Sequence, residues 1–349
     1  MPNPEEDIQG ATAIDFFARM NAEGVDYALL RNYEHFPKFH HDLDLVVRWS
    51  DLPRWRSVAK SCAIDHGWSV LTECDHWACS SSREHTLQAL RFYSTNPPRY
   101  LHIDAFHAFL VLGLPLVDEE ALLRERTWDT RGFYRINESI ENFDRLLQIA
   151  SVAGKSEKPE TLEKIERYRQ RVLSFLEAGN DFVDLAAAIG FPKIAASLVL
   201  LRSGDVQSFK KEIDRQKRAW LIRRVLSHPF GASKMIFDRF VDYLRLFWIR
   251  PCGFTIRAFA SNEAQRERLE QIMRRLVDAN VIFLFTSSTD SSERRRVKER
   301  AGIVLDWVSM KSAQIVMDGQ ADEQGIIAKL LALIIERHPR VWDGRETSG

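Results

Sequence analysis

Long apolar runs are missing from this sequence. No stretch approaches the roughly 18 to 20 residues that a membrane-spanning helix needs, and the first seven residues lack the basic and apolar segments of a secretory signal peptide. The sequence therefore predicts a protein that works in the cytoplasm and does not span a membrane.

Cysteine is scarce and is not arranged as a disulfide framework. The chain has four cysteines in 349 residues: Cys62, Cys74, Cys79 and Cys252. This spacing argues against a small secreted fold held together by disulfides. Cys74, His76 and Cys79 carry metal-ligating side chains, but no second ligand pair accompanies them, so we expect them to have structural roles.

The chain also lacks net charge, because 49 basic residues balance 49 acidic ones. No overall field then draws it to nucleic acid or to an anionic membrane, and any such binding must be local. Two basic stretches, at residues 210–218 and at Arg223-Arg224, occur in a predicted helical region with interspersed acids. A solvated helix face is the expected interpretation, and nucleic acid is a weak candidate partner.

The sequence does contain enough apolar material for two or three domains. Hydrophobic residues make up 45% of the 349 positions, as in ordinary globular proteins. Changes in the residue pattern predict three parts: an α+β part at 1–117, a helical region at 118–250 and a small parallel α/β unit at 251–349. The predicted fold class is therefore α/β with a mixed sheet, a helical middle and an α/β C-terminal unit.

The first part reads as helices and short strands. Period-two and apolar patterns predict strands at 27–31, 42–47, 68–72, 76–80, 86–93 and 99–106, and helices at 11–24 and 52–67. These elements indicate a mixed sheet with helices on one side.

The third part begins with a predicted strand, a helix and a second apolar strand. Such an order predicts a parallel crossover. The elements are expected at 254–259, 262–279 and 281–285, followed by a strand at 314–317 and a closing helix at 324–337. The cluster Arg294-Arg295-Arg296 is expected at the start of a helix.

Three acidic residues stand on two of the predicted strands of the first part. Because side chains alternate along a strand, Asp42 and Asp44 share one face while Leu43 and Leu45 point into the core. Asp104 lies on a second strand. Carboxylates held close together repel each other, and a hard divalent cation removes that cost. Asp42, Asp44 and Asp104 therefore form a candidate site for one or two Mg²⁺ ions, with a solvated strand end as the alternative.

These residues carry a resemblance to a known group of enzymes. Leu29-Leu30-Arg31-Asn32, then nine residues, then Asp42-Leu43-Asp44-Leu45-Val46-Val47, and later Leu101-His102-Ile103-Asp104, resemble the nucleotidyltransferase superfamily of the polymerase-β type. More narrowly, the first third of the chain is similar to uncharacterised bacterial nucleotidyltransferases often linked to surface-polysaccharide genes. The resemblance implies Mg²⁺-dependent transfer of a nucleoside monophosphate from an NTP to an acceptor such as a sugar, a glycan or a protein.

The resemblance also implies roles for individual residues. Asp42 and Asp44 would bind the metal ions, and Asp104 would bind one of them and act as the base or orient it. Arg31 and Asn32 stand where the superfamily usually has a glycine followed by serine or glycine. Both are therefore expected to contact the phosphates of the substrate, with Arg31 holding a phosphate through its side chain.

A further phosphate contact is expected in the helical region. Lys155, which follows Gly154, has the charge and the place in the chain for this role. A surface lysine without such a role is the alternative interpretation.

The C-terminal part resembles an abbreviated thymidylate-kinase-like P-loop domain. Phe254 to Phe259 with its helix, Val281 to Phe285 and Ile315 to Gly319 carry this resemblance. A working P-loop needs a glycine-rich turn and a Lys-Ser/Thr pair, whereas residues 260–265 read Ala-Ser-Asn-Glu-Ala-Gln. We therefore expect a degenerate domain that does not bind ATP in the usual way and could contact a protein partner.

Two functions remain open from the sequence. The first is an active nucleotidyltransferase with a nucleotide and an unidentified acceptor as its partners. The second is a catalytically inactive interaction or regulatory protein built on degenerate nucleotidyltransferase and kinase folds, which the Arg31-Asn32 pair and the missing P-loop favour.

Overall fold

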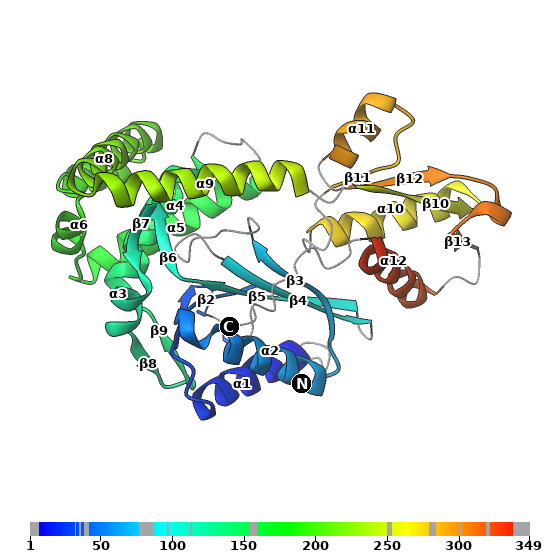
Figure 1. Ribbon diagram of the computed structural model, residues 1–349, viewed down its shortest axis with the longest axis horizontal. Coiled ribbons are helices and arrows are strands. Elements are labelled where there is room, and N and C mark those ends of the chain that lie inside the picture. Colours follow the sequence, from blue (N-terminus) through cyan, green and yellow to red (C-terminus); the bar gives the residue numbers. More distant parts are fainter. Residues whose placement is uncertain are drawn as a thin grey trace.

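The protein was analysed as a computed structural model, drawn in Figure 1. The structure describes residues 7–31, 33–34, 36–37, 42–76, 87–95, 98–111, 114–153, 159–249, 253–278, 284–299, 302–318 and 322–337. Its strands form mixed and parallel sheets with helices packed on them, which confirms the predicted α/β class.

A mixed sheet of seven strands organises the N-terminal part. Its strand order is β3-β4-β5-β2-β1-β9-β8. β2 runs parallel to β5 and β1 runs parallel to β9, while the other neighbours are antiparallel. The strands are β1 (Tyr27–Arg31), β2 (Asp42–Val47), β3 (Ser69–His76), β4 (Leu87–Thr95), β5 (Pro98–Phe106), β8 (Thr127–Asp129) and β9 (Phe133–Arg135).

One face of this sheet packs on two N-terminal helices. They are α1 (Asp7–Ala22) and α2 (Leu52–Asp65), the latter preceded by the short turn η2 (Trp49–Asp51). Phe16 of α1 and Trp55 of α2 lie in one core with strand residues such as Leu29 and Leu45. Leu29 and Leu45 are fully buried, as the alternation of side chains along these strands predicts.

The opposite face is also covered by helices near β1 and β2 (Figure 1). These are α3 (Glu119–Arg124) and α4 (Glu138–Val152). Leu122 and Ile140 of these helices pack with Leu30 and Val46 of the strands. The prediction that helices lie on one side only is therefore wrong, because apolar residues on both faces of β1 and β2 require cover on both faces.

The first of two neighbouring predicted strands is longer than expected. Strands were expected at residues 68–72 and 76–80, and β3 runs without a break from Ser69 to His76. Glu73 and Asp75 interrupt the apolar pattern, yet the backbone of β3 stays paired to β4 through both positions. Residues 77–80, including Cys79, lie outside the described residues.

Most of the predicted helical region 118–250 is a bundle of helices that follows the hairpin of β6 (Ala108–Val111) and β7 (Leu114–Asp118). The start of that region differs from the prediction, because β8 and β9 pair with each other and extend the large sheet through β1. Phenylalanines supply much of the buried core, among them Phe143, Phe182, Phe191 and Phe209. The helices after α4 are α5 (Pro159–Glu177), α6 (Val183–Ile189), α7 (Ile194–Arg202), α8 (Val206–Ser227) and α9 (Pro229–Ile249).

The C-terminal part is a small unit with a parallel sheet of four strands. The strand order is β11-β12-β10-β13, and all described pairs are parallel. Its elements are β10 (Phe254–Ala260), α10 (Glu263–Asp278), β11 (Phe285–Thr286), α11 (Ser291–Glu299), β12 (Ile303–Trp307), η4 (Met310–Ser312), β13 (Ile315–Met317) and α12 (Glu323–Arg337).

The neighbour of β10 in this sheet differs from the predicted one. The sequence pattern predicts a second strand at 281–285, whereas β12 lies between β10 and β11. The apolar run at the start of β12 is only Ile303-Val304-Leu305, too short to stand out as a buried strand. Of the predicted strand, residues 281–283 lie outside the described residues, and β11 covers Phe285 and Thr286.

The turn from β10 into α10 occupies the place where a P-loop would lie. It consists of Ser261 and Asn262, and the Oδ1 atom of Asn262 accepts a hydrogen bond from the backbone N of Gln265 at 3.0 Å. A side chain thus caps a helix terminus that a working P-loop leaves open to phosphate.

Two tyrosines of the large sheet connect it to the C-terminal unit. Tyr93 of β4 and Tyr100 of β5 face each other across the strand pair, and both pack against the core of the C-terminal unit. Within the described residues, no helix has both the length and the apolar content needed to cross a membrane.

Candidate active site

The ends of β2 and β5 bring the predicted acids together on one face of the sheet. The two strands pair in parallel, with Asp42 beside His102 and Asp44 beside Asp104. Leu43 and Ile103 point to the opposite face, where α1 and α2 cover them. Asp42, Asp44 and Asp104 therefore lie on the face that the helical region covers, as the period of two predicts.

An irregularity in β1 adds Arg31 to this face. Leu29 pairs with Leu45, but Arg31 already pairs with Asp44, so β1 has one residue more than β2 at this point. Such a bulge changes which face the following side chain points to. In a regular strand Arg31 would share the face of Leu29, whereas here its guanidinium reaches the acids.

The Arg31 guanidinium bridges two carboxylates. Its Nε lies 2.5 Å from Oδ2 of Asp44, and its Nη1 lies 3.4 Å from Oδ2 of Asp144 on α4. Burial alone would lower the pKa of Arg31, but the carboxylates of Asp44 and Asp144 outweigh it and raise the pKa well above its usual range. Arg31 is thus a permanent positive charge inside the acid cluster.

Asp104 remains short of positive charge in this arrangement. Burial, followed by the neighbouring carboxylates of Asp44 and Asp42, raises its pKa to about 7, while Arg91 and Arg31 act in the opposite direction. Burial raises the pKa of Asp144 as well, against the effect of Arg31. The site therefore has more carboxyl groups than its own cations neutralise, which favours a bound cation or a bound proton.

Helix α5 adds a lysine and a tyrosine that the sequence analysis did not identify. Burial, followed by repulsion from Arg31, lowers the pKa of Lys164, while the carboxylates of Asp42 and Asp44 act to raise it. The Lys164 side chain is itself exposed, so solvent weakens these effects and leaves the ammonium group open to a ligand. Its Nζ lies 5.5 Å from the ring centre of Tyr168, one helical turn further on.

The sequence contains a weak indication that one side of α5 is buried against another part of the protein. Lys164 and Tyr168 are four residues apart and therefore share a helix face, and Ile165 and Val172 mark the buried side of the same helix. The sequence pattern shows that α5 packs on something, but it does not show that the packing partner is the acid-bearing face of the sheet.

Two of the predicted site residues lie outside the described residues. These are Asn32 and Lys155. Their predicted phosphate contacts stay predictions, and Lys164 is the described lysine that lies near the acids.

A network of buried polar side chains connects the segment that follows β1 to α4. Tyr33 donates a short hydrogen bond to Glu141, and Arg145 pairs with Glu141 at 2.5 Å and with Glu34 at 2.8 Å. Despite these partners, burial raises the pKa of Glu141 to about 7. The ion pair with Arg145 lowers the pKa of Glu141, whereas burial raises it. The effect of burial is larger because Arg145 shares its charge between two carboxylates.

The raised pKa of Glu141 predicts how stability depends on pH. Folded Glu141 keeps its proton up to a pH of about 7, whereas the unfolded side chain releases it near 4.5. Its contribution to stability is therefore complete below 4.5 and is lost as the pH rises to about 7, at up to about 1.4 kcal/mol per pH unit.

A Glu141→Gln variant should flatten this decline, because glutamine does not titrate. The measurement is the free energy of unfolding by urea at several pH values between 4.5 and 7. Glu163→Gln, at an exposed position of α5, is the control and should keep the wild-type slope. Equal slopes for wild type and Glu141→Gln would contradict the assignment.

A different set of side chains has donor atoms close enough together to share a single metal ion. Among the described residues, Asp15, Cys62 and His66 have donor atoms that all lie within 4.8 Å of one another, and the three strand acids are not gathered this closely. Burial, however, raises the pKa of the Cys62 thiol to about 12, and Arg19 pairs with Asp15 at 2.8 Å. Hydrogen bonds from Cys62 and His66 to Asp15 account for the cluster without a metal.

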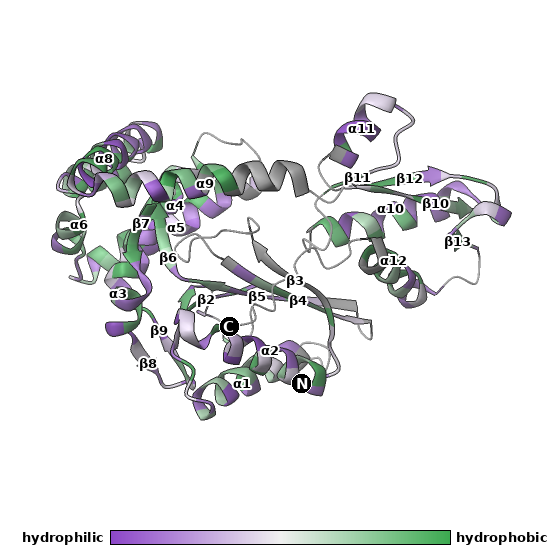
Figure 2. Ribbon diagram, viewed as in Figure 1, coloured by the Kyte–Doolittle hydropathy of each residue, from purple (hydrophilic) through white to green (hydrophobic). Residues whose placement is uncertain are grey.

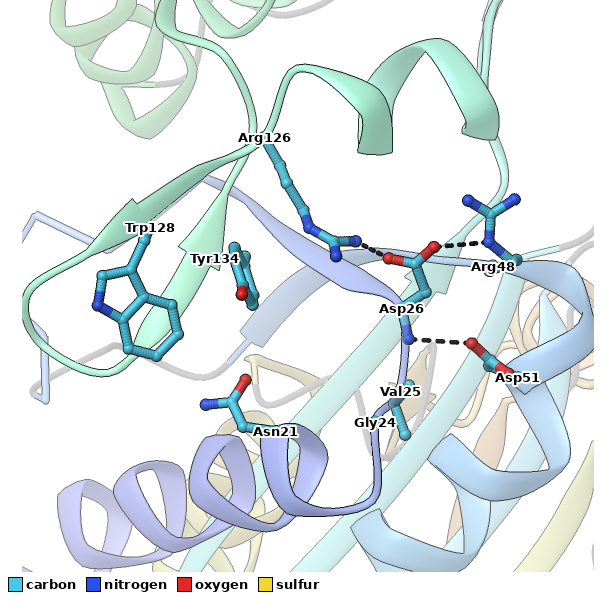
Figure 3. A pocket seen from close by; sticks show the side chains of 9 residues that line it. All are labelled: Asn21, Gly24, Val25, Asp26, Arg48, Asp51, Arg126, Trp128 and Tyr134. Atoms are coloured by element: carbon cyan, nitrogen blue, oxygen red, sulfur yellow. Dashed lines mark hydrogen bonds and ion pairs between the residues drawn. The ribbon is translucent and has the colours of Figure 1, made fainter.

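A cavity of about 570 Å³ lies at the other ends of the same strands (Figure 3). In it, Asp26 is held between Arg48, with Nε at 2.6 Å, and Arg126. Asp26 precedes β1 and Arg48 follows β2, whereas Arg31 and Asp44 lie at the opposite ends of these strands. None of the predicted site residues lines this cavity.

Comparisons with known proteins add little to this geometry. No protein-family model matches the chain, and no curated protein matches it. The solution structure of the antibiotic-resistance factor ANT(2'')-Ia is similar over 64% of this chain and 100% of that one, with 13% sequence identity and a TM-score of 0.34. At this level the similarity carries no argument about activity, so the case for function depends on the residues described above.

Proposed function

We propose that this protein is a Mg²⁺-dependent nucleotidyltransferase that moves a nucleoside monophosphate from an NTP to an acceptor hydroxyl. The observation that carries the proposal is the side-by-side placement of Asp44 and Asp104 on parallel strands, on a face that also holds Asp42 and Arg31. Lys164 of α5 lies close enough to Asp42 and Asp44 to interact with them electrostatically. Incubation of the protein with α-labelled NTPs and Mg²⁺ is the direct test. Neither transfer of label nor release of pyrophosphate, with any NTP, would contradict it.

The donor set fits magnesium. Asp42, Asp44 and Asp104 offer carboxylate oxygens, the ligands that Mg²⁺ prefers. Burial, followed by the neighbouring carboxylate of Asp44, raises the pKa of Asp104, and a divalent cation would offset the repulsion between these carboxylates. Gathering the three carboxylates around one ion requires side-chain rotation, including release of Asp44 from Arg31. When bound, Mg²⁺ would neutralise charge that develops on the phosphate oxygens.

The proposed reaction assigns separate tasks to the protein's own groups. The acceptor oxygen forms a bond to the α-phosphorus, the bond from that phosphorus to the bridging oxygen breaks, and pyrophosphate leaves. Asp104 takes the proton of the acceptor hydroxyl, since it lies beside Asp44 on the same face of the sheet. Arg31, once released from Asp44, and Lys164 are the side-chain cations in reach of the phosphates.

Lys164 provides a test of this arrangement. A Lys164→Met variant should lower kcat/KM for the NTP by roughly tenfold to a hundredfold, mainly through a higher KM, because one charged hydrogen bond to the phosphates is lost. Lys164→Arg should retain most of the activity. Lys210→Met on α8, where the lysine pairs with Asp214, is the control, and a similar loss there would show that the effect at Lys164 is not local.

A second candidate function has a specific observation in its favour. The ion pair between Arg31 and Asp44 neutralises one of the acids within the protein itself. A chain whose metal ligand is permanently held by arginine would be an inactive interaction or regulatory protein. Isothermal titration distinguishes the two: Mg²⁺-dependent NTP binding supports the enzyme, and its absence supports the inactive protein.

The remaining assignments extend the proposal to the rest of the chain. A sugar, a glycan or a protein hydroxyl are the candidate acceptors, and we place the reaction in the cytoplasm, where NTPs are available. We further propose that the C-terminal unit is a remnant of a thymidylate-kinase-like domain that contacts a protein partner and not ATP, because Asn262 caps the helix terminus that would hold phosphate.

A further inference from the structure

An apolar surface lies on the hairpin of α8 and α9, on the side away from the helical core. Phe230 is 90% exposed, and Leu226 is 75% exposed. We call this surface the hairpin face. Its exposed apolar members are Ile222, Leu226, Phe230, Ile236, Phe237 and Phe240.

The hairpin face is separate from the surface that holds the helices in the fold. The buried side of α8 uses Phe209, Ile213 and Trp220, and that of α9 uses Ala232. The helical core is therefore complete without the exposed residues. Six of the fourteen large apolar side chains that are exposed among the described residues lie within residues 222–240, a concentration that scattered exposed apolar residues do not show.

The exposed phenylalanines of α9 form a stripe. Phe230, Phe237 and Phe240 are separated by seven and three residues, a spacing that places them on one side of a helix. Figure 1 shows α9 along the upper edge of the molecule, and Figure 2 shows green and purple residues mixed along α8 and α9. Exposed apolar residues such as Phe237 and exposed charged residues such as Lys234 therefore alternate along α9.

Positive charge surrounds the hairpin face. Residues 215–240 contain seven Lys or Arg and one Asp, a net charge of +6, and because the whole chain has a net charge of 0, the rest of it carries −6. Arg224 and Lys234 are exposed, and Lys234 pairs with the acid of this segment, Asp238, at 3.1 Å. The chain as a whole has no net charge, but this segment carries a local positive charge that can attract anionic partners.

The combination of exposed apolar side chains and positive charge favours one kind of binding partner for the hairpin face over others. A second copy of the chain seated on the same face would bring two segments of charge +6 together and would be repelled. A nucleic acid would satisfy the charges but would leave most of the apolar side chains in water. An anionic lipid surface satisfies both, because its headgroups attract Lys and Arg while its acyl boundary accepts Phe, Leu and Ile.

We propose that the outer side of the α8–α9 hairpin is a docking surface for anionic membranes. The phenylalanine stripe enters the boundary between headgroups and acyl chains, and the flanking arginines and lysines contact the lipid phosphates. The helices lie in the plane of the interface. This proposal does not depend on nucleotidyl transfer.

Vesicle flotation of the full-length protein tests the proposal. Vesicles of phosphatidylcholine with about one third phosphatidylglycerol should carry the protein at low salt, vesicles of phosphatidylcholine alone should bind it far less, and salt should weaken the binding. Phe230→Ser/Phe237→Ser should lower the partition coefficient about tenfold or more. Arg224→Gln/Lys234→Gln should lower it by up to about thirtyfold.

Matched control variants carry the same changes elsewhere. Ile64→Ser removes an apolar residue that is 58% exposed on α2, and Arg274→Gln removes a charge that is 69% exposed on α10. Both should bind vesicles as the wild type does, and all variants should unfold at the same temperature.

Three outcomes would overturn the proposal. The first is no binding to anionic vesicles at low salt, and the second is binding that the hairpin variants leave unchanged. The third is a dimer, seen by light scattering, that Phe230→Ser/Phe237→Ser dissociates, because the hairpin face would then be covered by a second copy of the chain.

Discussion

An Asp44→Asn variant is expected to lose nucleotidyl transfer by about a thousandfold or more in kcat/KM. Asp44 lies at the centre of the acid cluster: it pairs in register with Asp104, contacts Arg31 at 2.5 Å and is almost completely buried. Asparagine keeps the shape of the side chain but removes the negative charge that a metal ion needs. The measurement is the rate of label transfer from an α-labelled NTP at saturating Mg²⁺.

The control for this experiment is another strand aspartate that pairs with an arginine. Asp306 of β12 contacts Arg294 at 3.0 Å, far along the chain from the acid cluster. Asp306→Asn should transfer label at the wild-type rate. If Asp44→Asn kept most of its activity while remaining folded, the three strand acids would not be the catalytic site.

An Arg31→Met variant is expected to lose about 3 to 5 kcal/mol of unfolding free energy in the absence of divalent ions. The change leaves Asp44 and Asp144, which Arg31 holds together, without a common counter-charge inside the protein. Urea unfolding monitored by tryptophan fluorescence measures the loss. Arg294→Met, which breaks a partly exposed pair with Asp306, should cost less than about 1 kcal/mol.

Magnesium turns the Arg31→Met experiment into a test between the two candidate functions. If the acids bind Mg²⁺, the ion should restore part of the stability of Arg31→Met, and by more than it stabilises the wild type, because it no longer competes with the guanidinium. If the protein is inactive and its acids do not bind a metal ion, Mg²⁺ should leave the unfolding curve of the variant unchanged.

Strands β1, β2 and β5 show how much of the fold could be predicted from the sequence. Period-two alternation in Asp42–Val47 and in the strand around Asp104 correctly assigns each side chain to a face, because that assignment depends only on local geometry. Their pairing as parallel neighbours places Asp44 beside Asp104. The prediction that these residues form the catalytic site stays a prediction.

The contribution of the helices to the candidate site could not be predicted in this way. Asp144 and Lys164 belong to α4 and α5, whose own patterns indicate a buried side but not the surface on which it packs. Which helix covers the acid-bearing face is decided by packing over more than 100 residues of intervening chain, as between Arg31 and Asp144. Strand β12 was missed for a related reason, since its apolar run is short and its burial comes from both neighbouring strands.

Because of the extra residue in β1, the geometry of the acid cluster depends on the number of residues in this strand and not only on which residues they are. Ala28 and Leu30 share the face of Val46, and the bulge then directs Arg31 to that face as well. If β1 paired with β2 without this bulge, Leu30 would lie opposite Asp44, and the guanidinium of Arg31 would point toward the phenylalanines of α1. Single-codon insertions or deletions in this strand shift side chains relative to β2 and should therefore be more damaging than conservative exchanges such as Leu30→Ile. Relatives of this chain should be aligned here by counting residues as well as by matching them.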